Sequence, residues 1–86
     1  MTAPLPVRVT VLDTWDDIAL TLPGNTPIAD LKRAALARSK VRRAPAEYVV
    51  KYNGAELYEP GNTLANAGVV PNGALIVLRR RRAPVR

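Results

Sequence analysis

One segment of this chain has the apolar spacing of a helix, and strand-like segments precede and follow it. Ile28, Leu31 and Ala35 recur at intervals of three and four residues, which places an apolar stripe on one side of a helix. Thr26 and Pro27 predict where the helix begins, because Thr can cap the first turn and Pro fits the first helical position. A single helix among strands restricts the chain to a mixed α and β architecture.

The other residues of this helix predict its exposed side and its end. Lys32, Arg33 and Arg38 are expected on the exposed face or near the C-terminal end, where cations are favourable. We expect the helix to end near Ser39, because Pro45 and the residue before it cannot continue a helix.

Apolar residues elsewhere alternate with polar ones, which is the period of a half-buried strand. Two such runs joined by a short polar segment predict an N-terminal hairpin, and the pair Asn53 and Gly54 predicts a tight turn after the third run. One helical or 3₁₀ turn is expected over residues 63–68. The expected strands are residues 7–11, 18–22, 48–52, a short strand at 56–58, and 75–78.

Composition limits the chemistry that this chain can perform. Its 86 residues allow one domain, and the absence of Cys and His removes thiolate nucleophiles, zinc-thiolate sites and the commonest general base. We therefore expect no enzyme, no cofactor and no metal. Asp13, Asp16 and Asp17 crowd one short segment, which indicates a solvated turn, with a hard-cation site as the alternative.

No apolar run approaches the roughly 20 residues that a membrane-spanning helix needs. The first nine residues lack the cationic start and apolar centre of a signal peptide. These features predict a cytoplasmic protein without a membrane span.

Several short motifs follow one another at regular places in the chain. They are the helix entry from Thr26 to Lys32, a Gly-x-x-Leu step ending at Leu57 and a Gly-x-Thr-Leu step ending at Leu64. In their order and spacing, residues 7–82 resemble ubiquitin. This resemblance implies an α+β ubiquitin-like β-grasp, a mixed four- to five-stranded sheet curled around one helix in the order ββαβ(β)β. Residues 1–6 would be a lead-in, residues 7–80 the domain, and residues 81–86 a basic tail.

Two departures from that family bear on function. Conjugating members end in Leu-Arg-Gly-Gly, whereas Arg81, Arg82, Ala83 and Pro84 stand in the equivalent positions here. The resemblance therefore implies a non-conjugated interaction module, similar to the bacterial YukD-like proteins associated with type VII secretion or to a subunit of a larger complex. A modifier with a processed C-terminus is the alternative.

The second departure concerns the apolar recognition patch of ubiquitin, where Lys51 takes the place of an Ile. Alternation puts Lys51, Ile76 and Leu78 on the solvent face, where Trp15 could cover them. We expect these residues to form a partner-binding patch, because aromatic and Arg residues are enriched at interface hot spots. The alternative is that Trp15 folds onto its own hairpin and that the strand residues are ordinary. The arginines expected to steer the partner are Arg79, Arg80, Arg81 and Arg82.

The charge of the chain is uneven as well as positive. The net charge is +6, and five arginines lie in the last eight residues. A second cluster follows the helix, and the sequence leaves open whether the two clusters share one end of the sheet. Such a field attracts acidic proteins, anionic lipid and nucleic acid. We expect a protein partner with an acidic surface. Nucleic-acid binding is the further alternative. It would be weak, because Tyr48, Tyr52 and Tyr58 are expected to be partly buried and to offer little stacking surface.

Overall fold

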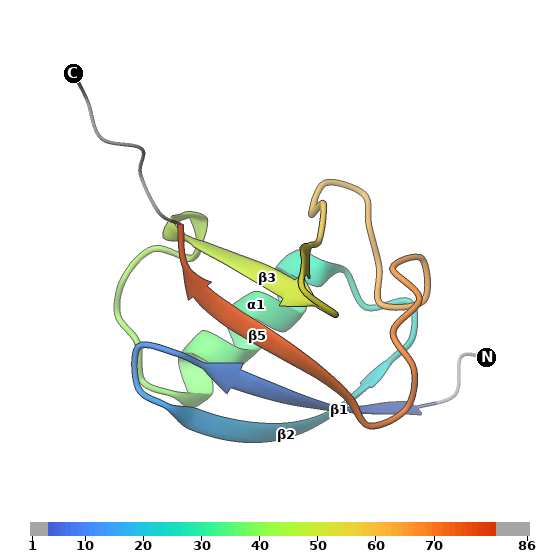
Figure 1. Ribbon diagram of the computed structural model, residues 1–86, viewed down its shortest axis with the longest axis horizontal. Helices are drawn as coiled ribbons and strands as arrows, with labels where there is room; N and C mark the ends of the chain where they lie inside the picture. The colour runs from blue at the N-terminus through green and yellow to red at the C-terminus, as the bar shows by residue number, and fades with distance from the viewer. Residues whose placement is uncertain (1–3, 81–86) are drawn as a thin grey trace.

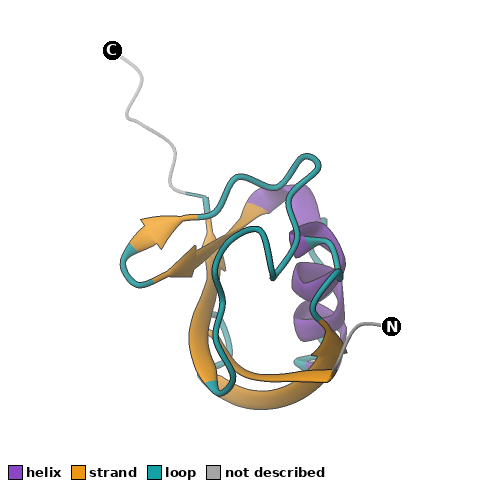
Figure 2. Ribbon diagram, turned by 90° about the vertical axis from the view of Figure 1, so that its right-hand side faces the viewer, coloured by secondary structure: helices purple, strands orange, loops and turns teal. Residues whose placement is uncertain are grey.

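The computed structural model describes residues 4–80, in which a curled sheet packs against one helix (Figures 1 and 2). The strands lie in the order β2-β1-β5-β3-β4 across the sheet. β1 and β5 are parallel, and the other neighbours are antiparallel. The elements are β1 (Pro4–Val11), β2 (Asp16–Pro23), α1 (Ile28–Arg38), the 3₁₀ turn η1 (Pro45–Glu47), β3 (Tyr48–Tyr52), β4 (Ala55–Glu56) and β5 (Gly73–Arg79).

The predicted fold class, a mixed sheet curled around one helix, is confirmed. β1 begins at Pro4, three residues earlier than predicted, because Pro4 and Leu5 still pair with the end of β2. The short strand is Ala55–Glu56 rather than residues 56–58, because it forms only two pairs with β3 after the turn at Asn53 and Gly54. Both turn residues have positive φ, as the predicted tight turn requires.

An aliphatic core fills the space between α1 and the concave side of the sheet. Strand alternation directs Val7, Val9 and Val11 of β1 inward, and each is at most 1% exposed. The predicted apolar stripe of α1 is buried against them. The other fully buried aliphatic side chains include Ile28, Leu31, Val50, Leu64, Leu75 and Val77.

The start of α1 differs from the prediction. Pro27 occupies the capping position, and no side chain caps the helix. The Thr26 backbone is instead held by loop contacts, since its carbonyl accepts a hydrogen bond from the Leu64 amide at 3.0 Å. The loop that follows β4 therefore fixes the start of the helix.

The end of α1 at Arg38 agrees with the prediction and has the geometry of a Schellman motif. The Val41 amide donates to the Leu36 carbonyl at 3.0 Å, and the Lys40 amide donates to the Ala37 carbonyl at 3.1 Å. Lys40 has φ of 60°, a conformation that usually calls for Gly. A charged side chain thus occupies a strained position at this end of the molecule.

The predicted turn at residues 63–68 is present. The Thr63 hydroxyl accepts a hydrogen bond from the Asn66 amide at 3.1 Å, and Gly68 closes the turn with φ of 78°. Among residues 4–80, no helix is long and apolar enough to cross a membrane.

Candidate functional site

The convex side of the sheet, which faces away from α1, carries three of the residues predicted to bind a partner. We call it the outer face. Lys51 of β3 pairs with Ile76 of β5, and Val49 pairs with Leu78, so these four side chains alternate outward together. Ile76 is 39% exposed, whereas Lys51 and Leu78 are half-buried. The structure therefore brings three of the predicted contact residues onto one surface.

A shallow hollow of about 490 Å³ lies at the β3–β5 side of this face. Val49, which is only 5% exposed, and Leu78 supply its apolar part. Lys51, Arg79, Arg80 and Glu56 supply its charged lining, and Arg80 Nη1 lies 3.8 Å from Glu56 Oε2. We call Val49, Lys51, Ile76 and Leu78 the docking patch.

Trp15 does not cover the docking patch as predicted. Its side chain is 79% exposed at the turn between β1 and β2, so it packs neither on the patch nor down onto its own hairpin. Its φ of 55° belongs to the left-handed region, which is uncommon for a bulky residue. The exposure of Trp15 contradicts both predicted placements of its side chain, whereas its predicted contact with a partner stays a prediction.

The predicted arginines divide into two groups. Arg79 pairs with Tyr48 at the end of the sheet, and the Arg80 amide donates to the Glu47 carbonyl at 2.6 Å. These contacts fix the end of β5 beside η1. Arg81 and Arg82 lie outside the described residues.

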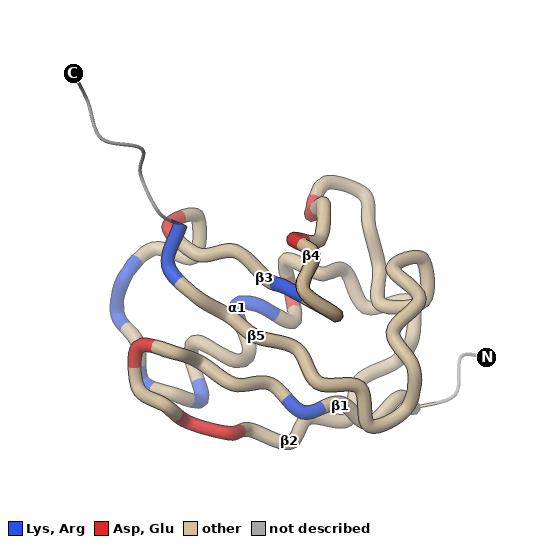
Figure 3. The backbone as a smooth tube through the Cα atoms, viewed as in Figure 1, with Lys and Arg blue, Asp and Glu red and all other residues tan. Residues whose placement is uncertain are grey.

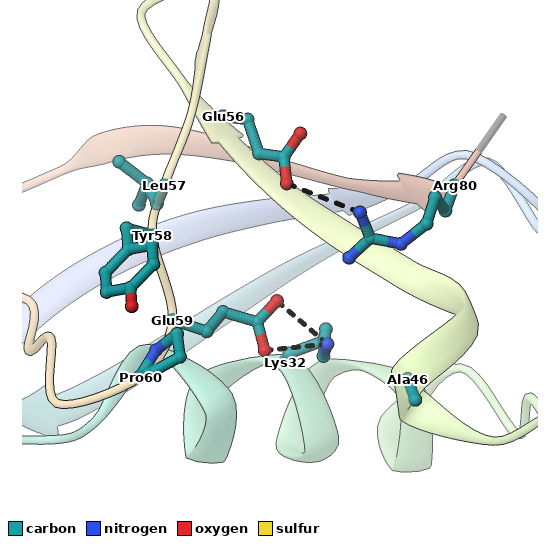
Figure 4. A pocket seen from close by; sticks show the side chains of 8 residues that line it. All are labelled: Lys32, Ala46, Glu56, Leu57, Tyr58, Glu59, Pro60 and Arg80. Carbon is teal, nitrogen blue, oxygen red and sulfur yellow. Dashed lines mark hydrogen bonds and ion pairs between the residues drawn. The ribbon is translucent and has the colours of Figure 1, made fainter.

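A second hollow of about 430 Å³ lies between α1, η1 and the loop after β4 (Figure 4). Lys32 lies at its edge with only 4% of its surface exposed, which corrects the prediction that this residue faces solvent. The Lys32 ammonium donates to the Glu59 carboxylate at 2.8 Å and to the Tyr48 carbonyl at 3.0 Å. Because both partners hold the ammonium, Lys32 ties α1 to β3 and is unsuited to act as a nucleophile.

The signal for this burial was present in the helix pattern. Lys32 follows Ile28 by four residues and precedes Ala35 by three, so it lies on the apolar stripe. A lysine side chain is usually exposed to solvent, whereas the position of Lys32 on the stripe indicates that it faces the core. Its partner Glu59 is 27 residues away, and no local pattern could identify it.

Tyr52 is half-buried as predicted. Tyr48 is fully buried and Tyr58 is 73% exposed, so the prediction that they are partly buried was wrong for these two. The Tyr48 hydroxyl donates to Asp13 Oδ2 at 2.5 Å, which joins the β1–β2 turn to the start of β3. Burial, followed by the hydrogen bond to Asp13 and its negative charge, raises the pKa of Tyr48 to about 12 against the opposing charges of Arg43 and Arg79. The phenol is therefore a neutral structural donor.

The acidic turn provides no metal cluster among the described residues. Asp13 accepts the Tyr48 hydroxyl, and Asp17 pairs with Arg8 at 2.7 Å. Two of the three carboxylates thus have partners from other segments, which favours the solvated, hydrogen-bonded turn over the cation site.

The arrangement of strands, helix and outer face defines an α+β ubiquitin-like β-grasp. Ubiquitin from Caldiarchaeum subterraneum has this fold with a TM-score of 0.78 and 16% identity, covering 95% of this chain and 100% of that one. A designed protein based on ubiquitin superposes with a TM-score of 0.77 and 20% identity, covering 96% of each chain. No protein-family model matches the sequence, and no curated protein sequence matches it. At these identities, the similarity to both structures shows a shared fold.

Proposed function

We propose that this chain is a non-enzymatic, non-conjugated ubiquitin-like module that binds an acidic, apolar segment of another protein on the docking patch. The observation that carries the proposal is an exposed Ile76 between Lys51 and Thr10 on neighbouring strands, next to the hollow floored by Val49. An aliphatic side chain of the partner would lie on Ile76, Leu78 and Val49. Its carboxylates would pair with the surrounding cations.

The charges around the docking patch support an acidic partner. Lys51 forms no ion pair within residues 4–80, and the Arg80–Glu56 pair is long and half-exposed. Exposed pairs of this kind contribute little to stability, so a carboxylate of the partner can compete for Arg80 at small cost. Cationic rims of this type raise association rates and select against basic partners.

The non-conjugated character rests on the residues that follow β5. Arg81, Arg82, Ala83 and Pro84 occupy the positions where conjugating relatives carry Leu-Arg-Gly-Gly, and Pro84 restricts φ where those relatives have free glycines. Within this class, our narrower proposal is a cytoplasmic YukD-like protein that acts as an accessory of a bacterial secretion system. Co-purification of a secretion ATPase with the tagged protein would support it.

A peptide selection tests the docking patch directly. A random peptide library displayed on phage is selected on the immobilised full chain, and we expect sequences that combine an aliphatic residue with flanking Asp or Glu. Ile76→Glu should weaken the selected peptides by at least about tenfold, because it places an anion in the centre of the patch. Thr21→Glu, on the outward-facing side of the edge strand β2, is the matched control and should leave binding unchanged.

Selected peptides that are basic, or that bind Ile76→Glu as well as the natural chain, would overturn the docking proposal. The non-conjugated character is tested separately by incubating the full chain with ATP and source-cell lysate and blotting for adducts. Adducts that disappear when Ala83 and Pro84 are changed would establish a modifier instead.

A further inference from the structure

The sequence left open whether the two basic clusters share one end of the molecule, and the structure shows that they do. Loop 39–44 leads into η1, whose Glu47 carbonyl accepts a hydrogen bond from the Arg80 amide. Tyr48, the next residue, pairs with Arg79. Figure 3 shows the basic stretches of loop 39–44 and of the end of β5 on the same side of the molecule.

Most of the cations that form no ion pair within residues 4–80 lie at this end of the molecule. Five of the seven carboxylates in the chain are engaged in ion pairs. Within residues 4–80, five cations form no ion pair, and four of them are exposed and lie at the end of α1, in loop 39–44 or at the end of β5. We call these four the basic end: Arg38, Lys40, Arg42 and Arg79.

The turn that carries Trp15 is held against the basic end. Asp13 of that turn accepts the hydrogen bond from the Tyr48 hydroxyl, and the charges of Arg43 and Arg79 act on the same phenol. Trp15 therefore offers its exposed indole two residues from a fixed contact with this end of the sheet. The docking patch does not use this side chain.

Two side chains in this region are held in backbone conformations that Gly would adopt without steric cost. Lys40 has φ of 60°, and Trp15 has φ of 55°. A non-Gly residue in this region carries a steric cost, because its Cβ lies too close to the following carbonyl oxygen. Both residues lie in turns and expose their side chains, one a cation and the other an aromatic ring.

We propose that the basic end binds the phosphate backbone of single-stranded nucleic acid, with an unpaired base stacked on Trp15. Guanidinium groups pair bidentately with phosphate oxygens. The four exposed cations, which the end of α1, loop 39–44 and the end of β5 carry, can follow a strand of spaced phosphates. An exposed indole provides the stacking surface that binders of unpaired bases use. The carboxylates of the Trp15 turn oppose this binding only in part, because Asp13 and Asp17 have partners and Asp16 alone has none among the described residues.

Trp15 is the only Trp in the chain, so its fluorescence reports on the proposed site directly. The full chain is titrated with an oligo(dT) of about 20 nucleotides at about 50 mM and about 200 mM NaCl. We expect quenching of Trp15 fluorescence and binding that weakens steeply with salt. Four phosphate contacts give a slope of log K against log salt of about −3.

Matched variants locate the site. Arg38→Ala with Arg42→Ala should weaken binding roughly tenfold at the lower salt and reduce the slope by about 1.4. The control, Arg33→Ala with Lys51→Ala, removes the same charge from outside the basic end and should bind as the natural chain does. Arg33 lies on α1, and Lys51 pairs with Ile76 on the outer face of the sheet. Asp16→Asn should strengthen binding about two- to threefold.

Three outcomes would overturn the proposal. Equal losses in both double variants would show a response to net charge rather than a built surface. Complete loss on changing Arg81, Arg82 and Arg86 to Ala, with no effect of the Arg38 and Arg42 changes, would assign binding to the tail. Poly-L-glutamate at equal charge is the competing ligand. If it displaces oligo(dT) and Trp15 fluorescence is the same with either ligand bound, the surface is a binder of acidic protein.

Discussion

Tyr48 is the residue at which three separate segments of the chain meet. Its hydroxyl holds Asp13 of the β1–β2 turn, its carbonyl accepts from Lys32 of α1, and its backbone pairs with Arg79 of β5. Because the phenol is fully buried, its ionisation would have to occur inside the core. The hydrogen bond that holds the Trp15 turn therefore depends on the Tyr48 phenol staying protonated.

The raised pKa of Tyr48 predicts a loss of stability at alkaline pH. The folded state favours the neutral phenol, so its contribution is complete below the ordinary value of 10.0 and declines as pH rises from 10 through about 12. Across this window the natural chain should lose about 2–3 kcal/mol more than Tyr48→Phe. Urea unfolding of both proteins at a series of pH values measures the difference, and parallel curves would contradict the prediction.

The buried pair of Lys32 and Glu59 predicts strong coupling between two substitutions. Lys32→Met should cost about 3 kcal/mol, because it leaves the mostly buried Glu59 carboxylate without its counter-ion. Combining it with Glu59→Leu should recover a large part of that loss. A double-mutant cycle by urea denaturation checks this, and additive losses would show that the pair contributes no interaction energy.

The elements show which signals a sequence of this kind contains. Alternation predicted the strands and the outer positions of Lys51, Ile76 and Leu78, because one buried face fixes every side chain of a strand. The same pattern could not place Trp15, whose direction depends on a positive φ set by the turn. Nor could it assign the start of α1, where a backbone contact from Leu64 replaces the expected Thr26 cap. Local periodicity determined the elements, and contacts between distant residues determined their ends.

The end of α1 offers a direct measurement of retained strain. Lys40→Gly should stabilise the domain by about 0.5–1 kcal/mol, because Gly adopts the left-handed conformation of the Schellman motif without a Cβ clash. Arg42→Gly, in the same loop but without positive φ, should be neutral or destabilising. Thermal unfolding of the two variants provides the comparison, and a destabilised Lys40→Gly would show that no strain is stored there.

At the scale of the whole molecule, the last strand of the domain is the centre of its sheet. β5 pairs with β1 on one side and β3 on the other, so the two ends of the described chain join in a parallel pair. Both proposed surfaces depend on this strand, since it carries Ile76 and Leu78 on the outer face and Arg79 at the basic end. The order of the strands thus places both proposed surfaces on one central strand.

This topology predicts the pattern of amide hydrogen exchange. The β5 and β1 amides should exchange most slowly, because they lie in the interior of the sheet and open only with the whole domain. The amides of β4, a two-residue edge strand, should exchange fastest among the strands. Exchange followed by NMR tests this order, and fast exchange in β5 would contradict it.

Because Lys32 is buried, its chemical labelling can report on how often the domain opens. The chain has three lysines, and Lys40 and Lys51 reach solvent whereas Lys32 is enclosed. An amine-reactive mass tag should therefore label the first two rapidly and the third only in molecules whose helix has separated from β3. Mass spectrometry of the tagged protein would then measure the fraction of molecules in which α1 has separated from β3 at each time of labelling.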